Sequence, residues 1–371
     1  MTIAQSFEPG SRLEAPRLGI VIPVHRQPGL VDEALGSALG QMEDGRAVIA
    51  VVDDGCPMAE TPATLRAWSA LDPLRVATLR RPNGGLSAAR NAGLRWLLAR
   101  YPSIEAFFML DADNRLGPDA LAVFEAALES RPDADWFYPP FDKFGLSASD
   151  ARGGPYSLLR HSWDNFCEAG SLIRRRVFES GLRFDEEMKL GYEDWDFFLC
   201  AAREGFRGSP LEAPVFRYRQ RAVSMLTGAR EDHDEIRGYI RRKHRWLFNP
   251  RAALRLEQAE QPRYRVLFAD SGRILALTDP LAPAHEASFD SFDEAVWRWR
   301  ADPDACAAGS LWVSTTEPVW ATLRDAGLLR FALWDLERRL EGRHFAFTAL
   351  HASEEGALTL GAASDRGAHL E

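Results

Sequence analysis

Short apolar runs alternate with longer amphipathic stretches between residues 18 and 139. The apolar runs predict buried strands at Leu18–Val24, Ala47–Val52, Arg75–Leu79, Ala106–Leu110 and Trp136–Pro139. The amphipathic stretches predict helices at Leu30–Gln41, Pro62–Leu71, Ser87–Arg100 and Pro118–Ser130. Strands that alternate with helices in this way are typical of α/β proteins, so the sequence predicts a mostly parallel sheet flanked by helices.

Two of the predicted helices carry local signals for their first turns. Ser87 follows Gly84-Gly85 and predicts an N-cap, because its hydroxyl can accept a hydrogen bond from a free backbone N–H. The pair Gly117-Pro118 predicts a helix with proline in its first turn, where the missing N–H costs little.

The pattern weakens after residue 139. The segment Lys143–Trp163 is rich in Gly, Ser and Asp and predicts a long loop. Beyond it we expect a strand, a helical turn or two, an amphipathic helix and a further strand, at Ala169–Ile173, Arg174–Ser180, Glu193–Gly205 and Ala213–Tyr218 respectively.

The character of the chain changes again near Asn249-Pro250. We expect a hairpin at Tyr264–Asp279 with its turn at Ser271-Gly272, and helices at Ser291–Arg300 and Pro318–Gly327. The sequence therefore predicts an N-terminal extension of residues 1–17, a main domain of residues 18–248 and a smaller C-terminal α+β extension of residues 249–371.

Composition narrows the class of protein. The 371 residues are 46% hydrophobic and 27% charged, as in soluble globular proteins, and the net charge of −9 argues against nucleic acid as a partner. The four cysteines form no Cys-x-x-Cys pair, so neither a disulfide framework nor a zinc site is supported. No apolar run reaches about 18 residues, and residues 1–17 lack the apolar core of a signal peptide. We therefore expect a cytoplasmic protein.

A basic run, Arg241-Arg242-Lys243-His244-Arg245, leaves contact with a membrane open. It ends a predicted helix, where positive charge is electrostatically favoured, so a solvated helix end is the simpler interpretation. Trp246 and Phe248 beside it keep peripheral contact with the inner face of the membrane as the alternative. A homo-oligomer also stays open.

Three acidic clusters follow one another along the chain, and their positions matter more than their composition. They are Asp53-Asp54-Gly55, Asp111-Ala112-Asp113-Asn114 and Glu193-Asp194-Trp195-Asp196. The pattern Asp-x-Asp alone occurs five times here and proves nothing. The first two clusters, however, each end a predicted buried strand, and ligands of open α/β sheets bind at those carboxyl ends.

Each of these features also has a structural interpretation. Asp53-Asp54-Gly55 could be no more than a polar turn that closes a strand, and Asp111 and Asp113 could be caps of a helix. Glu193 and Asp194 could merely complement a helix N-terminus, and we expect Asp196 to be structural.

Taken together, the motifs resemble the family-2 glycosyltransferases of the GT-A fold. The resemblance covers roughly residues 18–225 and rests on five elements in order: Ile22-Pro23-Val24-His25-Arg26, Val52-Asp53-Asp54-Gly55, Gly85-Leu86-Ser87-Ala88-Ala89-Arg90-Asn91, Asp111-Ala112-Asp113-Asn114 and Gly191-Tyr192-Glu193-Asp194-Trp195-Asp196. It implies a GT-A-type sheet, a nucleotide-sugar donor with a UDP-sugar favoured, a divalent cation, and transfer with inversion at the anomeric carbon.

The resemblance also implies roles for single residues. The residues expected to bind the nucleotide sugar are Pro23, Val24, His25, Arg26, Asp53, Asp54, Asn83, Arg90, Asp111, Ala112 and Arg221. Asp113 is the expected direct ligand of Mn²⁺ or Mg²⁺, with Asp111 beside it, because these cations prefer oxygen ligands. Asp194 matches the general base that deprotonates the acceptor hydroxyl, and Glu193 belongs to the same catalytic pair.

The sequence departs from the family at one position. Many relatives show Tyr-Arg-x-His-x-x-Ser-Met where this chain has Tyr218-Arg219-Gln220-Arg221-Ala222-Val223-Ser224-Met225. Arg221 cannot ligate a cation, so we expect it to contact diphosphate oxygens instead.

Two other functions remain as alternatives. A sugar-1-phosphate nucleotidyltransferase would want a glycine-rich loop straight after the first strand, whereas Pro23 to Pro28 contains no glycine. A non-catalytic nucleotide- or carbohydrate-binding protein would not need Asp113 and Asp194 together. The acceptor is left open among a lipid-linked sugar, a polysaccharide end, a protein and a small molecule.

Overall fold

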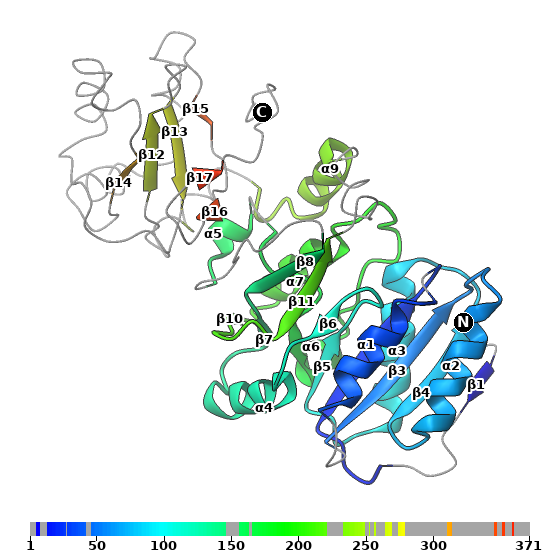
Figure 1. Ribbon diagram of the computed structural model, residues 1–371. Helices are drawn as coiled ribbons and strands as arrows, with labels where there is room; N and C mark the ends of the chain where they lie inside the picture. Colours follow the sequence, from blue (N-terminus) through cyan, green and yellow to red (C-terminus); the bar gives the residue numbers. More distant parts are fainter. Residues whose placement is uncertain are drawn as a thin grey trace, which may run out of the picture. The chain divides into compact units, whose positions relative to one another are not determined.

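The computed structural model describes residues 5–7, 13–26, 28–41, 46–145, 156–162, 165–220 and 233–248, residues 252 and 256, and six short strands after them. The chain divides into two compact units, residues 1–153 with 165–240 and residues 154–164 with 241–371 (Figure 1). The domain limits predicted from the sequence stay a prediction.

The first unit is built on an eight-stranded sheet. In spatial order its strands are β1 (Gln5–Phe7), β4 (Val76–Arg81), β3 (Ala47–Asp54), β2 (Leu18–Val24), β5 (Ala106–Met109), β9 (Leu172–Arg174), β7 (Trp136–Tyr138) and β10 (Gly208–Pro210). The central pairs β4·β3, β3·β2 and β2·β5 are parallel, as is β7·β10, whereas β1 and β9 pair antiparallel with their neighbours. The predicted mostly parallel sheet flanked by helices is confirmed.

Helices cover both faces of the sheet because its central strands are apolar on both sides. The helices are α1 (Val31–Leu39), α2 (Glu60–Leu71), α3 (Leu86–Arg100), α4 (Ala120–Ser130), α6 (Arg175–Glu179) and α7 (Glu193–Arg203). All seven residues of β2 are buried, as expected for a strand packed between two layers. Ile20 and Ile22 of β2 share a core cluster with buried residues of α1 and α4. Val21, between them, faces Gly93 of α3 on the opposite side.

A second, three-stranded sheet lies in the same unit, in the order β6-β11-β8. Its strands are β6 (Arg115–Leu116), β11 (Phe216–Gln220) and β8 (Phe141–Gly145), and β11 pairs antiparallel with β6 and parallel with β8. The sequence predicted a strand near β11 but neither β6 nor β8.

Two predicted helix starts are wrong. Helix α3 begins at Leu86 with Gly85 as its N-cap, so Ser87 lies inside the first turn and is buried. Gly85 takes this position because its φ of +90° suits a residue without a Cβ. Helix α4 begins at Ala120 after Asp119, which places Pro118 before the helix instead of in its first turn.

The second unit contains α5 (Leu158–His161), the last turn of α9 (His233–Lys243) and several short strands. The strands are β12 (Tyr264–Phe268), β13 (Ile274–Thr278), β14 (Ser310–Val313), β15 (Phe345–Ala346), β16 (His351–Ala352) and β17 (Leu358–Thr359). Strands β12 and β13 pair antiparallel, as the predicted hairpin requires. Its turn at Ser271-Gly272 and the helices predicted at Ser291–Arg300 and Pro318–Gly327 lie outside the described residues.

Among the helices that the structure describes, none has both the length and the apolar character that crossing a bilayer requires.

Two glycines inside helices provide a matched test of this packing. A Cβ on Gly93 would lie 2.6 Å from Cγ1 of Val21, whereas a Cβ on Gly36 of α1 would meet nothing within 4 Å. Gly93→Ala should therefore lower the free energy of unfolding by about 1–3 kcal/mol through overpacking. Gly36→Ala should raise it by about 0.5–1 kcal/mol through helix propensity. Urea unfolding of both variants measures the two effects, and equal shifts would contradict the described position of α3.

Candidate active site

The first acidic cluster closes β3, and both of its carboxylates have partners inside the protein. Asp53 accepts a hydrogen bond of 2.8 Å from the N–H of Cys56 and lies 3.2 Å from Nη1 of Arg80. Asp54 accepts hydrogen bonds from Nη1 of Arg81 at 2.9 Å and from the N–H of Gly85 at 2.8 Å. The carboxylate of Asp54 thus holds the turn that leads into α3.

Asn83, in that turn, joins it to the end of β2. Its amide nitrogen donates to the carbonyl oxygen of Asp54 at 2.9 Å and lies 3.3 Å from Nδ1 of His25. Lys189 donates to the carbonyl oxygen of Gly84 from the other side. The structure therefore brings His25, Asp54 and Asn83 together, although they are far apart in the sequence.

The residues that follow β2 form the neighbouring edge of this region. Pro23 and Val24 are buried and lie in register with Val52 and Asp53 of β3. Arg26 is exposed and has a φ of +58°, which is unusual for a residue with a side chain. Backbone strain of this kind gathers at functional sites, so this edge remains a good candidate for nucleotide contact.

The second cluster follows β5 and alternates accessible carboxylates with buried residues. Asp111 and Asp113 are partly exposed, whereas Ala112 and Asn114 are buried. The N–H of Asn114 donates to the carbonyl oxygen of Asp111 at 3.0 Å, and its side-chain oxygen accepts the N–H of Arg219 at 2.9 Å. The turn is fixed by its buried members, so its two aspartates stay accessible to a cation.

The third cluster begins α7 after a tight turn. Gly191 and Tyr192 have φ values of +116° and +58°, and Glu193 is then the first helical residue. Asp194 accepts a hydrogen bond of 2.9 Å from Nδ2 of Asn165 and one of 3.3 Å from the N–H of Ala169.

The surroundings of Asp194 make it a stronger base than an ordinary aspartate. Burial, followed by the negative charge of Glu193, raises the pKa of Asp194 to about 7, while Arg90 and the backbone N–H groups act in the opposite direction. The residue as a whole is partly exposed.

Arg90 joins the second cluster to the third. Nη1 of Arg90 donates to Oε1 of Glu193 at 2.6 Å, and Nη2 donates to Asp111 at 2.8 and 3.1 Å. The side chain is 1% exposed and also packs on the ring of Phe184. Burial alone would lower the pKa of Arg90, but the charges of Asp111 and Glu193 outweigh it and raise that pKa, so the guanidinium stays charged.

This position gives Arg90 a task that the sequence did not predict. It holds two carboxylates in place, and the nucleotide contact expected for it stays a prediction. Its partners are 21 and 103 residues away along the chain, so no local signal could have identified them.

Sequence reasoning also missed Tyr218 and Asn165. Burial raises the pKa of Tyr218, and the charges of Glu168, Asp113, Asp111 and Asp194 raise it further, so its hydroxyl stays protonated. Tyr218 thus lies within the electrostatic reach of aspartates from two clusters. Strand alternation around Tyr218 was the available signal, whereas Asn165 lies in the segment after the predicted loop and had none.

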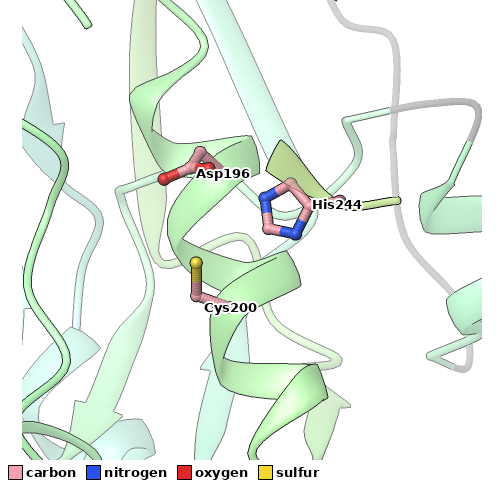
Figure 2. A group of neighbouring side chains, drawn as sticks. All are labelled: Asp196, Cys200 and His244. Atoms are coloured by element: carbon pink, nitrogen blue, oxygen red, sulfur yellow. The ribbon is translucent and has the colours of Figure 1, made fainter. Parts of the chain in front are cut away.

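Predictions from the sequence also concern Arg221 and Asp196. Arg221 lies outside the described residues, so its predicted contact with diphosphate is not tested. Asp196 is 1% exposed, in keeping with the structural role expected for it. Figure 2 shows Asp196 and Cys200 on consecutive turns of α7; His244, also labelled there, belongs to the second unit.

Comparison with known proteins identifies the domain. Residues 19–181 match the model of the family described as "Glycosyl transferase family 2". The chain is 27% identical over 230 residues to succinoglycan biosynthesis protein ExoW of Rhizobium meliloti (strain 1021), covering 53% of this chain and 70% of ExoW. It is 25% identical over 232 residues to the uncharacterized glycosyltransferase EpsJ of Bacillus subtilis (strain 168), covering 57% of this chain and 63% of EpsJ.

Solved structures of glycosyltransferases are more distantly similar. S. aureus TarS 1–349 in complex with UDP-GlcNAc matches with a TM-score of 0.49 and 16% identity, over 57% of this chain and 60% of TarS 1–349. The mannosyltransferase PcManGT from Pyrobaculum calidifontis, in complex with GDP-Man and Mn²⁺, matches with a TM-score of 0.46 and 17% identity, over 68% of this chain and 77% of PcManGT. At these values the structural likeness adds nothing to the family match. The resemblance read from the sequence is nevertheless confirmed by that match, which assigns residues 19–181 to glycosyl transferase family 2.

Proposed function

We propose that this domain transfers a sugar from a nucleotide-diphosphate sugar, with a UDP-sugar favoured, to an acceptor hydroxyl with inversion at the anomeric carbon. The observation that carries the proposal is the link between the second and third acidic clusters. Through Arg90, the accessible aspartate pair after β5 is tied to the end of α7 that carries Asp194. This link supports the proposal because it would hold a cation site for a diphosphate and a carboxylate base in one region.

Asp113 and Asp111 would hold the divalent cation, Mn²⁺ or Mg²⁺. Both carboxylates are accessible on a turn that is fixed by buried neighbours, and such ions usually take one or two protein carboxylates beside the phosphates of a substrate. When bound, the cation would stabilise the negative charge that develops on the leaving diphosphate. Pro23, Val24, His25, Arg26, Asp53 and Asn83 would border the nucleotide.

Asp194 would take the proton of the acceptor hydroxyl as the hydroxyl oxygen attacks the anomeric carbon. Asn165 and the N–H of Ala169 hold its carboxylate, so its orientation does not depend on the substrate. A pKa of about 7 places this base near neutral pH, where general bases work best. Glu193 is bound to Arg90 and would position Asp194 without touching the acceptor.

No feature of the described residues favours a nucleotidyltransferase or a non-catalytic binding protein. The acceptor stays open among a lipid-linked sugar, a polysaccharide end, a protein and a small molecule. A cytoplasmic location, with peripheral contact at the inner face of the membrane, and homo-oligomerisation stay predictions.

Calorimetric titration with UDP, GDP and dTDP tests the donor and the cation. We expect one nucleotide to bind in Mn²⁺ and to lose its affinity in EDTA. Asp113→Asn should weaken that binding about tenfold or more, because a charged ligand is lost. Asp133→Asn provides the control, since Asp133 is an exposed member of another Asp-x-Asp pattern. Binding that is equally strong in EDTA would rule out the proposed cation site.

The pH profile of sugar transfer tests the base. Because the base acts in its deprotonated form, the rate should rise with pH through about 7, the raised pKa of Asp194. Asp194→Asn should lower the rate about 100-fold or more while nucleotide affinity stays within about twofold. A variant that binds nucleotide and keeps its rate and pH profile would remove Asp194 from this role.

A further inference from the structure

Three arginines surround one phenylalanine on the three-stranded sheet β6-β11-β8. The Cζ atoms of Arg115, Arg217 and Arg219 lie 4.9, 5.2 and 4.5 Å from the ring centroid of Phe144. Cation–π attraction holds guanidinium groups of like charge beside one ring. The result is a concentration of positive charge on a protein whose net charge is −9.

Glu33 offsets part of this charge. Glu33 of α1 accepts hydrogen bonds from both Arg115 and Arg219. Nε of Arg115 is buried and has no hydrogen-bond partner.

The cluster lies on the opposite face of β11 from Tyr218. Alternate side chains of a strand point to opposite faces, so Arg217 and Arg219 share one face and Tyr218 points to the other, toward the carboxylates. Nε of Arg219 nevertheless donates to the carbonyl oxygen of Asp113 at 2.9 Å. Arg219 therefore contacts the Asp111–Asn114 turn from this face of the strand.

We propose that Arg115, Arg217 and Arg219 form a second binding site, for a phosphate-type anion, behind the Asp111–Asn114 turn. Planar guanidinium groups bind the oxygens of phosphate in pairs, and those of one cluster can share a single tetrahedral anion. The side chains of Arg115 and Glu33 are 35% and 37% exposed, so a small anion can reach them. Glu33 acts as the internal competitor of that anion. The proposal does not depend on transferase activity.

The test measures the rise in melting temperature caused by inorganic phosphate at constant ionic strength, with chloride as the reference. Arg217→Gln should weaken phosphate binding about tenfold, since a charge-assisted contact is lost. Glu33→Gln should tighten it about threefold, since the competing charge is gone. Arg66→Gln, on the exposed side of α2, should leave it unchanged.

The variants also separate a binding role from a purely structural one. A structural cluster would lose stability in Glu33→Gln without any gain in phosphate affinity, and that result would overturn the proposal. So would the absence of a saturable phosphate effect in the unmodified protein. Sedimentation with vesicles of phosphatidylglycerol or phosphatidylcholine then separates the sources of the anion. If the protein binds phosphatidylglycerol vesicles, and the same substitutions weaken or strengthen that binding as they do phosphate binding, the anion is a lipid headgroup. If it binds phosphate but not these vesicles, the anion is a soluble phosphate.

Discussion

The buried guanidinium of Arg90 is the interaction on which the candidate active site depends. It donates to Glu193 at the start of α7 and to Asp111 after β5, and it comes itself from α3. The guanidinium of Arg90 thus connects α3, the turn after β5 and the first turn of α7. Without it, Glu193 would be a buried carboxylate with no cation beside it, and losing one partner of such a pair typically costs about 3–5 kcal/mol.

The same charge separates the roles of neighbouring carboxylates. Glu193 is bound to Arg90, whereas Asp194 is held by neutral N–H donors and has a pKa of about 7. The two adjacent acids therefore have different partners, a charged guanidinium for Glu193 and neutral donors for Asp194. Asp54 differs from both, because its carboxylate accepts hydrogen bonds from Arg81 and from the N–H of Gly85 in the turn before α3. In the proposed function, similar residue types thus have binding, catalytic and structural tasks according to their contacts.

Much of this arrangement could be predicted from the sequence. The continuous apolar runs of β2 and β3 identified the buried centre of the sheet, and their ends located His25, Asp53 and Asp54. Strands β6 and β8 could not be found in this way. The first has two residues, and the second begins the polar segment that was predicted as a loop.

The helix starts and the partners of Arg90 needed the structure. Ser87 has the chemistry of an N-cap, but the positive φ of Gly85 places the start of α3 one residue earlier. Arg90 reads as an ordinary helix residue, and only the tertiary fold brings Asp111 and Glu193 to it. The local sequence pattern therefore predicts the strands and helices, and the edge of the sheet at which polar side chains lie. Ion pairs between residues far apart in the sequence depend on how these elements pack, so the sequence pattern does not reveal them.

A double-mutant cycle on Arg90 and Glu193 tests the central claim most directly. Urea unfolding would give the free energies of the unmodified protein, Arg90→Met, Glu193→Gln and the double variant. The contact at 2.6 Å predicts a coupling free energy of about 1.5–3 kcal/mol, with the double variant less destabilised than the sum of the single ones. Single effects that add to within about 0.5 kcal/mol would contradict the view that this ion pair holds the site together.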